Sequence, residues 1–177
     1  TVAILGLGSI GVEVAKRALS FGMRVRGIRR RADAPSPLPG VELVDSAAEA
    51  VTGARHIVIA APLTPATRHL VGHELLRCLT PGAHIVNIAR GGIVDQDALR
   101  VALDDGTVAC ASLDTVDPEP LPAGHWLYSH PQVRLSPHVS WSQPMSMGLL
   151  YEMFAANLTR YIAGEPLEGI VDRAERY

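Results

Sequence analysis

Polar side chains that could take part in catalysis follow three apolar runs of the 177-residue chain. Arg90 enters a two-glycine turn, where a planar guanidinium suits a substrate carboxylate. Asp114 and Glu119 follow a second run, and His138 follows a third. Ligands of open α/β sheets bind beyond the carboxyl ends of the strands, so we expect a cation, a carboxylate and an imidazole to arrive from three strand ends.

A glycine-rich loop comes directly after the first apolar run, Val2–Leu5, and precedes a helical pattern. Its sequence is Gly6-Leu7-Gly8-Ser9-Ile10-Gly11, which fits G-x-G-x-x-G. In this setting the first glycine allows a tight turn, the second lets a pyrophosphate approach the backbone, and the third lets the helix pack on the strand. The N–H groups at the helix start would bind the phosphates, so the loop predicts a dinucleotide site.

The segment after the second apolar run carries positive charge. In dinucleotide-binding sheets an acidic residue about 20 positions after the glycine loop binds the adenosine ribose and favours NAD. The corresponding residues here are Arg29, Arg30 and Arg31. Guanidinium groups bind a 2′-phosphate through charge-assisted hydrogen bonds, although at least one of the three is expected to be an exposed loop residue with no ligand role. We therefore expect NADP(H) to be preferred, with NAD(H) as the alternative cofactor.

Short apolar runs alternate with helical patterns along the chain. In the pattern after the glycine loop, Ile10, Val14 and Ala18 share one face. The alternation is typical of βαβ units and predicts an α/β fold, a Rossmann-type doubly wound parallel sheet in a single domain. The expected strands are Val2–Leu5, Arg24–Ile28, His56–Ala61, His84–Ile88, Val108–Leu113 and Val133–Leu135.

Prolines and glycines mark two further segments. Residues 29–40 include three prolines and are expected to form a surface loop. The last helix is expected to run from about Pro144 to Ala163 and to stop near Gly164.

Composition argues against several classes of partner. The net charge of −2 and the pI of about 6.3 give no general attraction to nucleic acid. No apolar run approaches the roughly 20 residues of a membrane span. Cys78 and Cys110 lie in apolar stretches and are expected to be buried, reduced thiols, which favours a cytoplasmic protein. His69 and His73 are four residues apart, but no third ligand is near in the sequence, so a surface or capping role is favoured over metal binding.

Taken in order, these segments resemble the signature blocks of the D-isomer-specific 2-hydroxyacid dehydrogenases, and the similarity covers nearly the whole chain. The resemblance implies hydride transfer between NADP(H) and a small 2-keto or 2-hydroxy acid. It implies that Arg90 binds the keto acid and polarises its carbonyl, and that His138, paired with Glu119, is the general acid and base. The cofactor contacts that it implies beyond the glycine loop and the arginines are Ala61, Pro62, Thr67, Ile88, Ala89, Asp114 and Ser140.

The family carries a separate substrate domain, mostly N-terminal to these blocks, and none of it precedes Thr1. We therefore expect residues 1–177 to be the dinucleotide-binding domain of a longer protein, with poor turnover by itself. Residues 165–177 are expected to form a tail that returns toward the missing domain. The resemblance also implies a homodimer.

Other functions fit the residues less well. A short-chain dehydrogenase needs Tyr-x-x-x-Lys, which none of the tyrosines provides. A methyltransferase would need a carboxylate where Arg29 stands, and it would leave Arg90, Glu119 and His138 unexplained. A dinucleotide-sensing protein, like the corepressors related to this family, could keep every motif. Turnover of a keto acid, lost in a His138→Ala variant, would distinguish the enzyme from the sensor.

Overall fold

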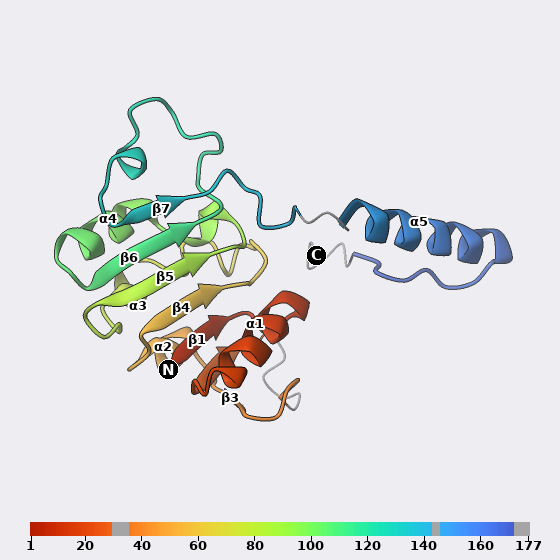
Figure 1. Ribbon diagram of the computed structural model, residues 1–177, viewed down its shortest axis with the longest axis horizontal. Helices are drawn as coiled ribbons and strands as arrows, with labels where there is room; N and C mark the ends of the chain where they lie inside the picture. Colours follow the sequence, from red (N-terminus) through yellow and green to blue (C-terminus); the bar gives the residue numbers. More distant parts are fainter. Residues whose placement is uncertain (30–35, 143–145, 172–177) are drawn as a thin grey trace. The chain divides into compact units, whose positions relative to one another are not determined.

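The computed structural model describes residues 1–29, 36–142 and 146–171. The chain divides into two compact units, Thr1–Pro137 and His138–Tyr177. The first unit is built on a seven-stranded parallel sheet in the order β3-β2-β1-β4-β5-β6-β7 (Figure 1). The strands are β1 Val2–Leu5, β2 Val25–Ile28, β3 Val41–Leu43, β4 His56–Ile59, β5 Ala83–Asn87, β6 Val108–Leu113 and β7 Val133–Leu135. The predicted Rossmann-type α/β fold is confirmed.

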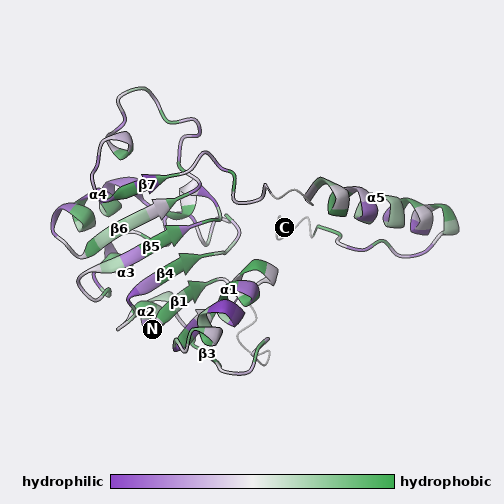
Figure 2. Ribbon diagram, in the orientation of Figure 1, coloured by the Kyte–Doolittle hydropathy of each residue, from purple (hydrophilic) through white to green (hydrophobic). Residues whose placement is uncertain are grey.

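Helices cover both faces of this sheet, because alternate strand residues belong to two apolar clusters. Leu5, Ile57 and Ile85 belong to the larger cluster, which includes residues of α2, α3 and α4. Ile4 and Val25 belong to the smaller one, beneath α1. Figure 2 shows how strongly apolar residues dominate the central strands. The helices of the first unit are α1 Ser9–Ser20, α2 Ala47–Val51, α3 His73–Leu76 and α4 Gln96–Asp104, with 3-10 turns η1 Gly91–Ile93 and η2 Trp126–Tyr128.

The order of the strands reverses at β1, which pairs with β2 on one side and with β4 on the other. The first crossovers run outward to β3, and the chain then returns to start β4 on the opposite side of β1. Such a switch opens a crevice at the carboxyl ends of the strands. The glycine loop lies there, because it directly follows β1.

Three strand predictions agree with the structure to the residue, namely β1, β6 and β7. The other three are shifted or shortened at their ends, and β3 was not predicted. β3 is a three-residue edge strand that exposes Glu42, and so short a segment carries no clear apolar run. Of the loop expected at residues 29–40, residues 30–35 lie outside the described part, and residues 36–40 lead into β3.

The expected apolar face of α1 is correct except at its first turn. Ala15 and Ala18 are buried, whereas Ile10 is 58% exposed. In this turn Gly11 is the residue that lies against Gly6 and Ile4, and Ile10 belongs to neither apolar cluster. The prediction that Ile10 belongs to the buried face is therefore wrong.

The second unit contains α5, Ser146–Ala163, which ends before Gly164 as predicted. The expected start near Pro144 lies outside the described residues. Asn157 fastens the following segment to the helix: its amide donates to the Glu168 carbonyl and accepts from the Glu168 N–H, each at 2.9 Å. Among the described residues, no helix is both long and apolar enough to cross a membrane.

Candidate active site

The glycine loop is held in contact with the segment after β4. Gly6 has a φ of 111°, which favours glycine, and a Cβ there would lie 2.6 Å from the backbone nitrogen of Ala61. A Cβ on Gly11 would overlap the carbonyl oxygen of Gly6. The conformations expected of the first and third glycines are therefore present, and they set the start of α1 directly on the loop.

The start of α1 is open. Gly8 caps the helix and is exposed, and a Cβ built on it would have no atom within 4 Å. No side chain accepts a hydrogen bond at this cap, and the first turn, which includes Ser9 and Ile10, holds no acidic residue. The first N–H groups of a helix have no partner within the helix, so this end can accept a phosphate. The chemistry of the loop therefore fits the pyrophosphate of a dinucleotide.

Arg29 follows β2 directly and is half-buried. β2 lies beside β1, so Arg29 follows the strand next to the one that leads into the glycine loop. A guanidinium at this strand end suits a 2′-phosphate on an adenosine ribose. Arg30 and Arg31 lie outside the described residues.

The corner after β4 is closed by one hydroxyl. Thr67 donates through Oγ1 to the carbonyl of Pro62 at 2.6 Å and accepts from the N–H of Thr64 at 2.8 Å. These bonds shape the Ala61–Thr67 turn that contacts Gly6. Among the described residues, the hydroxyl of Thr67 thus acts within its own loop.

A buried amide shapes the turn that presents Arg90. Asn87, the last residue of β5, is 0% exposed. Its Nδ2 donates to the carbonyl of Arg90 and its Oδ1 accepts from the N–H of Ala89, each at 3.0 Å. Arg90 is exposed, and its guanidinium donates to the Ala89 carbonyl at 2.7 Å, whereas Ile88 and Ala89 are half-buried. The sequence motifs do not single out Asn87, although an amide that ends an apolar strand beside a glycine turn is a usable signal.

Asp114 directly follows β6 and is 7% exposed. Its N–H donates to the Asn87 carbonyl at 2.9 Å, and its carboxylate accepts from the hydroxyl of Ser136. The neighbouring Thr115 is 2% exposed, and its hydroxyl has no hydrogen-bond partner among the residues that the structure describes. Three strand ends, those of β5, β6 and β7, therefore supply polar groups to one edge.

Glu119 is exposed on the segment between β6 and β7. This segment touches the Arg90 turn, because a Cβ on Gly91 would overlap the carbonyl group of Val116. The loops that carry the cation and the carboxylate are thus in direct backbone contact. The absence of a side chain at Gly91 is what permits that contact.

His138 and Ser140 belong to the second unit. His138 has a φ of 52°, a conformation uncommon for a residue other than glycine, and its carbonyl accepts from the indole N–H of Trp141 at 2.9 Å. Ser140 is exposed in the same segment. The pairing of His138 with Glu119 and the contact of Ser140 with the cofactor stay predictions.

The order and geometry of these segments agree with a comparison to known families. Residues 1–140 match the family described as D-isomer specific 2-hydroxyacid dehydrogenase, NAD binding domain. The chain belongs to this family. The match includes every residue for which we predict a catalytic or cofactor role.

Relatives in this dehydrogenase family cover nearly all of the chain. A glyoxylate reductase of Thermofilum pendens is 36% identical over 98% of the chain and 51% of its own length. A solved dehydrogenase of the family from Xanthobacter autotrophicus Py2, in complex with NADPH and MES, has a TM-score of 0.89 at 36% identity over 99% of this chain and 72% of that one. One from Lactobacillus delbrueckii ssp. bulgaricus, in an NAD-complexed form, has a TM-score of 0.85 at 27% identity over 97% of this chain and 55% of that one. The chain spans about half the length of the glyoxylate reductase.

These comparisons bear on the alternatives from the sequence. The named relatives are reductases or dehydrogenases, so the sensor alternative gains no support. NADPH and NAD both occur among the solved relatives. Membership of the dehydrogenase family therefore does not decide between the two cofactors, and the preference depends on the residues near the ribose.

Features away from this edge bear on two smaller predictions: the thiols are less buried than expected, whereas His69 and His73 are both exposed, as the favoured surface role predicts. Cys78 and Cys110 are free thiols but only partly buried, since Cys78 lies just past the short α3 and Cys110 on a strand face that α1 does not cover. His69 lies in a loop with a φ of 53° and His73 begins α3, so the two do not share a helix. Among residues 1–29, 36–142 and 146–171, no cluster of three His, Cys, Asp or Glu side chains could hold a metal ion.

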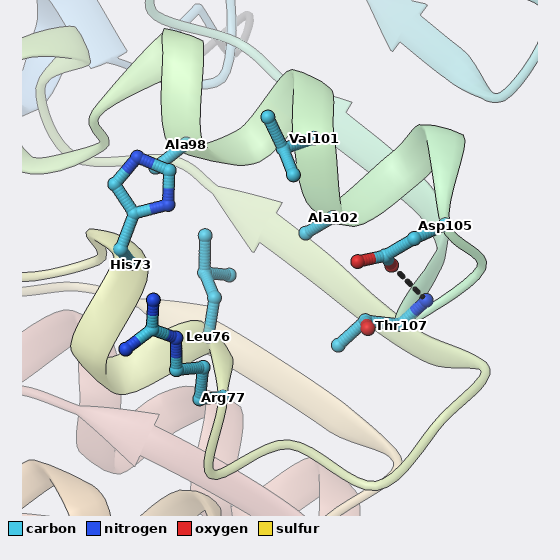
Figure 3. A pocket seen from close by; sticks show the side chains of 8 residues that line it. All are labelled: His73, Leu76, Arg77, Ala98, Val101, Ala102, Asp105 and Thr107. Atoms are coloured by element: carbon cyan, nitrogen blue, oxygen red, sulfur yellow. Dashed lines mark hydrogen bonds between the residues drawn. The ribbon is translucent and has the colours of Figure 1, made fainter.

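A hollow of about 270 Å³ lies between α3 and α4 (Figure 3). Leu76 and Ala102 line it, together with Arg77, and Asp105 accepts from the Thr107 N–H at 2.8 Å at its end. This hydrogen bonding to Thr107 lowers the pKa of Asp105. Thr107 directly precedes β6, which puts this end of the hollow at the amino ends of the strands and away from the candidate active site.

Proposed function

We propose that this chain is the cofactor-binding part of an oxidoreductase that transfers hydride between NADP(H) and a small 2-keto or D-2-hydroxy acid. The observation that carries the proposal is the open start of α1 at Gly8, next to β2, the strand that Arg29 directly follows. An anion-accepting helix end next to a cation suits a phosphorylated dinucleotide. The domain limits of 1–177, the homodimer and the cytoplasmic location stay predictions.

The preference for NADP(H) rests on charge. NAD-specific sheets place a carboxylate near the ribose, which would repel a 2′-phosphate, whereas this chain has Arg29 at that strand end. Arg30 and Arg31 follow in the sequence and would add to the positive potential. The NADPH complex of a relative that is 36% identical is consistent with this preference.

The reaction would divide the work among three side chains. Reduced nicotinamide supplies a hydride to the keto carbon when it is bound. Arg90 would hold the substrate carboxylate and stabilise the negative charge that develops on the keto oxygen. His138 would donate a proton to that oxygen, and Glu119 would favour the protonated imidazole. Asp114 would contact the nicotinamide carboxamide, held in place by Ser136.

The test is oxidation of NADPH by glyoxylate or hydroxypyruvate, followed in the longest natural polypeptide that carries this chain. We expect turnover that is lost in His138→Ala and Arg90→Gln variants, with binding of NADPH retained in both. A protein that binds NADPH tightly but turns over no 2-keto acid would contradict the proposed reaction.

A further inference from the structure

One side of α4 carries three polar residues at intervals of four, namely Gln96, Arg100 and Asp104. Residues spaced by four lie on one side of a helix. Each of the three contacts the segment between β6 and β7, the segment on which Glu119 lies. The helix therefore meets this segment at three successive points.

Gln96 makes the contact nearest to Glu119. Its Nε2 donates to the carbonyl of Asp117 at 2.5 Å, and its Oε1 accepts from the N–H of Asp117 at 3.1 Å. One side chain thus satisfies both backbone polar groups of a residue two positions before Glu119. Arg68 adds an ion pair to the Asp117 carboxylate at 3.6 Å from the segment after β4.

The other two contacts lie farther along the segment. The guanidinium of Arg100 lies 5.7 Å from the centre of the Trp126 ring, and the Asp104 carboxylate lies 3.3 Å from Nε2 of His130. Arg100 also lies 3.9 Å from Asp104. These contacts fasten the far end of the segment, so the part around Glu119 is held from both sides.

After Glu119 the segment is anchored by Leu121, which is 8% exposed in the larger apolar cluster and whose carbonyl accepts from the Tyr128 hydroxyl at 3.2 Å. Residues 114–125 form no strand or helix, and residues 117–120 are all exposed. A loop with its backbone in water loses conformational entropy when it is fixed, so its position depends on specific bonds. Near Glu119, the two bonds from Gln96 reach the backbone itself.

We propose that Gln96 is a positioning residue for Glu119, holding the Asp117 peptide groups so that the Glu119 carboxylate is presented to the catalytic imidazole. The inference rests on the proposed function, in which Glu119 assists His138. Arg100 and Asp104 support the same segment at its far end. Gln96 itself touches neither substrate nor cofactor in this account.

The test compares Gln96→Met, which keeps the length of the side chain but removes both polar groups, with Gln96→Glu, which keeps an acceptor for the Asp117 N–H. Gln132→Met is the matched control: Gln132 lies on the same segment, and within the described part of the chain its side chain makes no hydrogen bond. Amide exchange at Asp117 in this chain should be at least tenfold faster in Gln96→Met than in the wild type or the control. Gln96→Glu should fall between them.

Turnover is then measured in the longest natural polypeptide, to test whether Gln96 acts through Glu119. We expect Gln96→Met to lower kcat about tenfold with the KM for NADPH unchanged. We also expect it to move the fall of activity at high pH to lower pH, the same shift that we expect of Glu119→Gln. In a protein that already carries Glu119→Gln, Gln96→Met should lower kcat less than twofold, because the carboxylate that Gln96 positions is gone.

The outcomes separate the two levels of the proposal. If Glu119→Gln impairs turnover but Gln96→Met behaves like Gln132→Met, the positioning role is wrong and the proposed function stands. Equal losses from Gln96→Met with and without Glu119 would also overturn the inference. If the wild type turns over no 2-keto acid, the proposed function fails and the inference fails with it, whatever the exchange rate at Asp117.

Discussion

The two halves of the carboxyl edge of the sheet are built in different ways. Beside β1 the groups offered to a ligand belong to the backbone. Gly8 leaves the start of α1 open, whereas Gly6 and Gly11 let the loop pack closely on its neighbours. Beside β5 and β6 they are side chains, and buried polar atoms such as those of Asn87 fix the loops that carry them.

The difference follows from what each half would bind. A pyrophosphate is recognised by helix N–H groups that come with the fold, so this half needs chiefly the absence of side chains. A reacting carbonyl needs a cation and a proton donor placed closely, which requires supporting hydrogen bonds. Substitutions should therefore act through steric overlap in the first half and through lost hydrogen bonds in the second.

The largest effect is expected from Gly11→Ala in the backbone-built half. The added methyl would overlap the carbonyl oxygen of Gly6 and press on Ile4, and neither the strand nor the loop can yield easily. We expect the free energy of unfolding to fall by about 3 kcal/mol, measured by urea denaturation. Gly8→Ala is the control, since its Cβ meets nothing within 4 Å, and it should change stability by less than about 0.5 kcal/mol. Equal stability of the two variants would contradict the steric account.

Asn87→Leu tests the half built from side chains. The change leaves the Ala89 N–H and the Arg90 carbonyl without their buried partner, so the free energy of unfolding should fall by about 2 kcal/mol. Asn157→Leu is a matched control, because Asn157 also makes two bonds to backbone but at a less buried site on α5. It should cost under about 1 kcal/mol, and a cost as large as that at Asn87 would argue against the importance of burial.

Arg29→Gln should affect binding rather than folding. Loss of a charge-assisted contact to the 2′-phosphate is expected to weaken the binding of NADPH by about tenfold, or about 1.4 kcal/mol. The affinity for NADH should stay unchanged. Arg24→Gln, at the other end of the same strand run, is the control and should change neither affinity. Calorimetric titration measures both cofactors, and an equal loss for NADPH and NADH would remove the basis for the cofactor preference.

The smallest effect concerns His84 on β5, which lies on the sheet face opposite the larger cluster and bonds Ser112 at 2.9 Å. Burial, with the nearby charges of His56 and Arg134, lowers its pKa below the usual 6.5. The unfolded chain then binds more protons than the folded one, so stability is complete above pH 6.5 and decreases as the pH falls through the folded pKa. His84→Gln should flatten this decrease in urea denaturation between pH 7 and pH 5, and an unchanged slope would contradict it.

The same contrast explains what the sequence could predict. The glycine loop and the strands β1, β6 and β7 were predictable, because a backbone site shows itself as glycines at fixed spacing after an apolar run. The sequence does not identify Asn87 and Gln96, because their partners are backbone groups 2 to 21 residues away. A backbone group can belong to any residue type, so no sequence pattern reveals such a pair. Edge strand β3 is too short to show a period, and the exposure of Ile10 depends on which residue of the first turn of α1 packs on the sheet.

The most direct test of the central claim is titration of the chain with NADPH and with NADH, in the wild type and in Gly8→Val. A Cβ at this position meets no protein atom within 4 Å, so we expect the variant to fold, as its thermal melt will check, while its side chain would occupy the path of the pyrophosphate. We predict one-site binding to the wild type, tighter for NADPH than for NADH, and loss of both in Gly8→Val. Undiminished binding in a folded Gly8→Val variant, or no saturable binding to the wild type, would contradict a dinucleotide site at the start of α1.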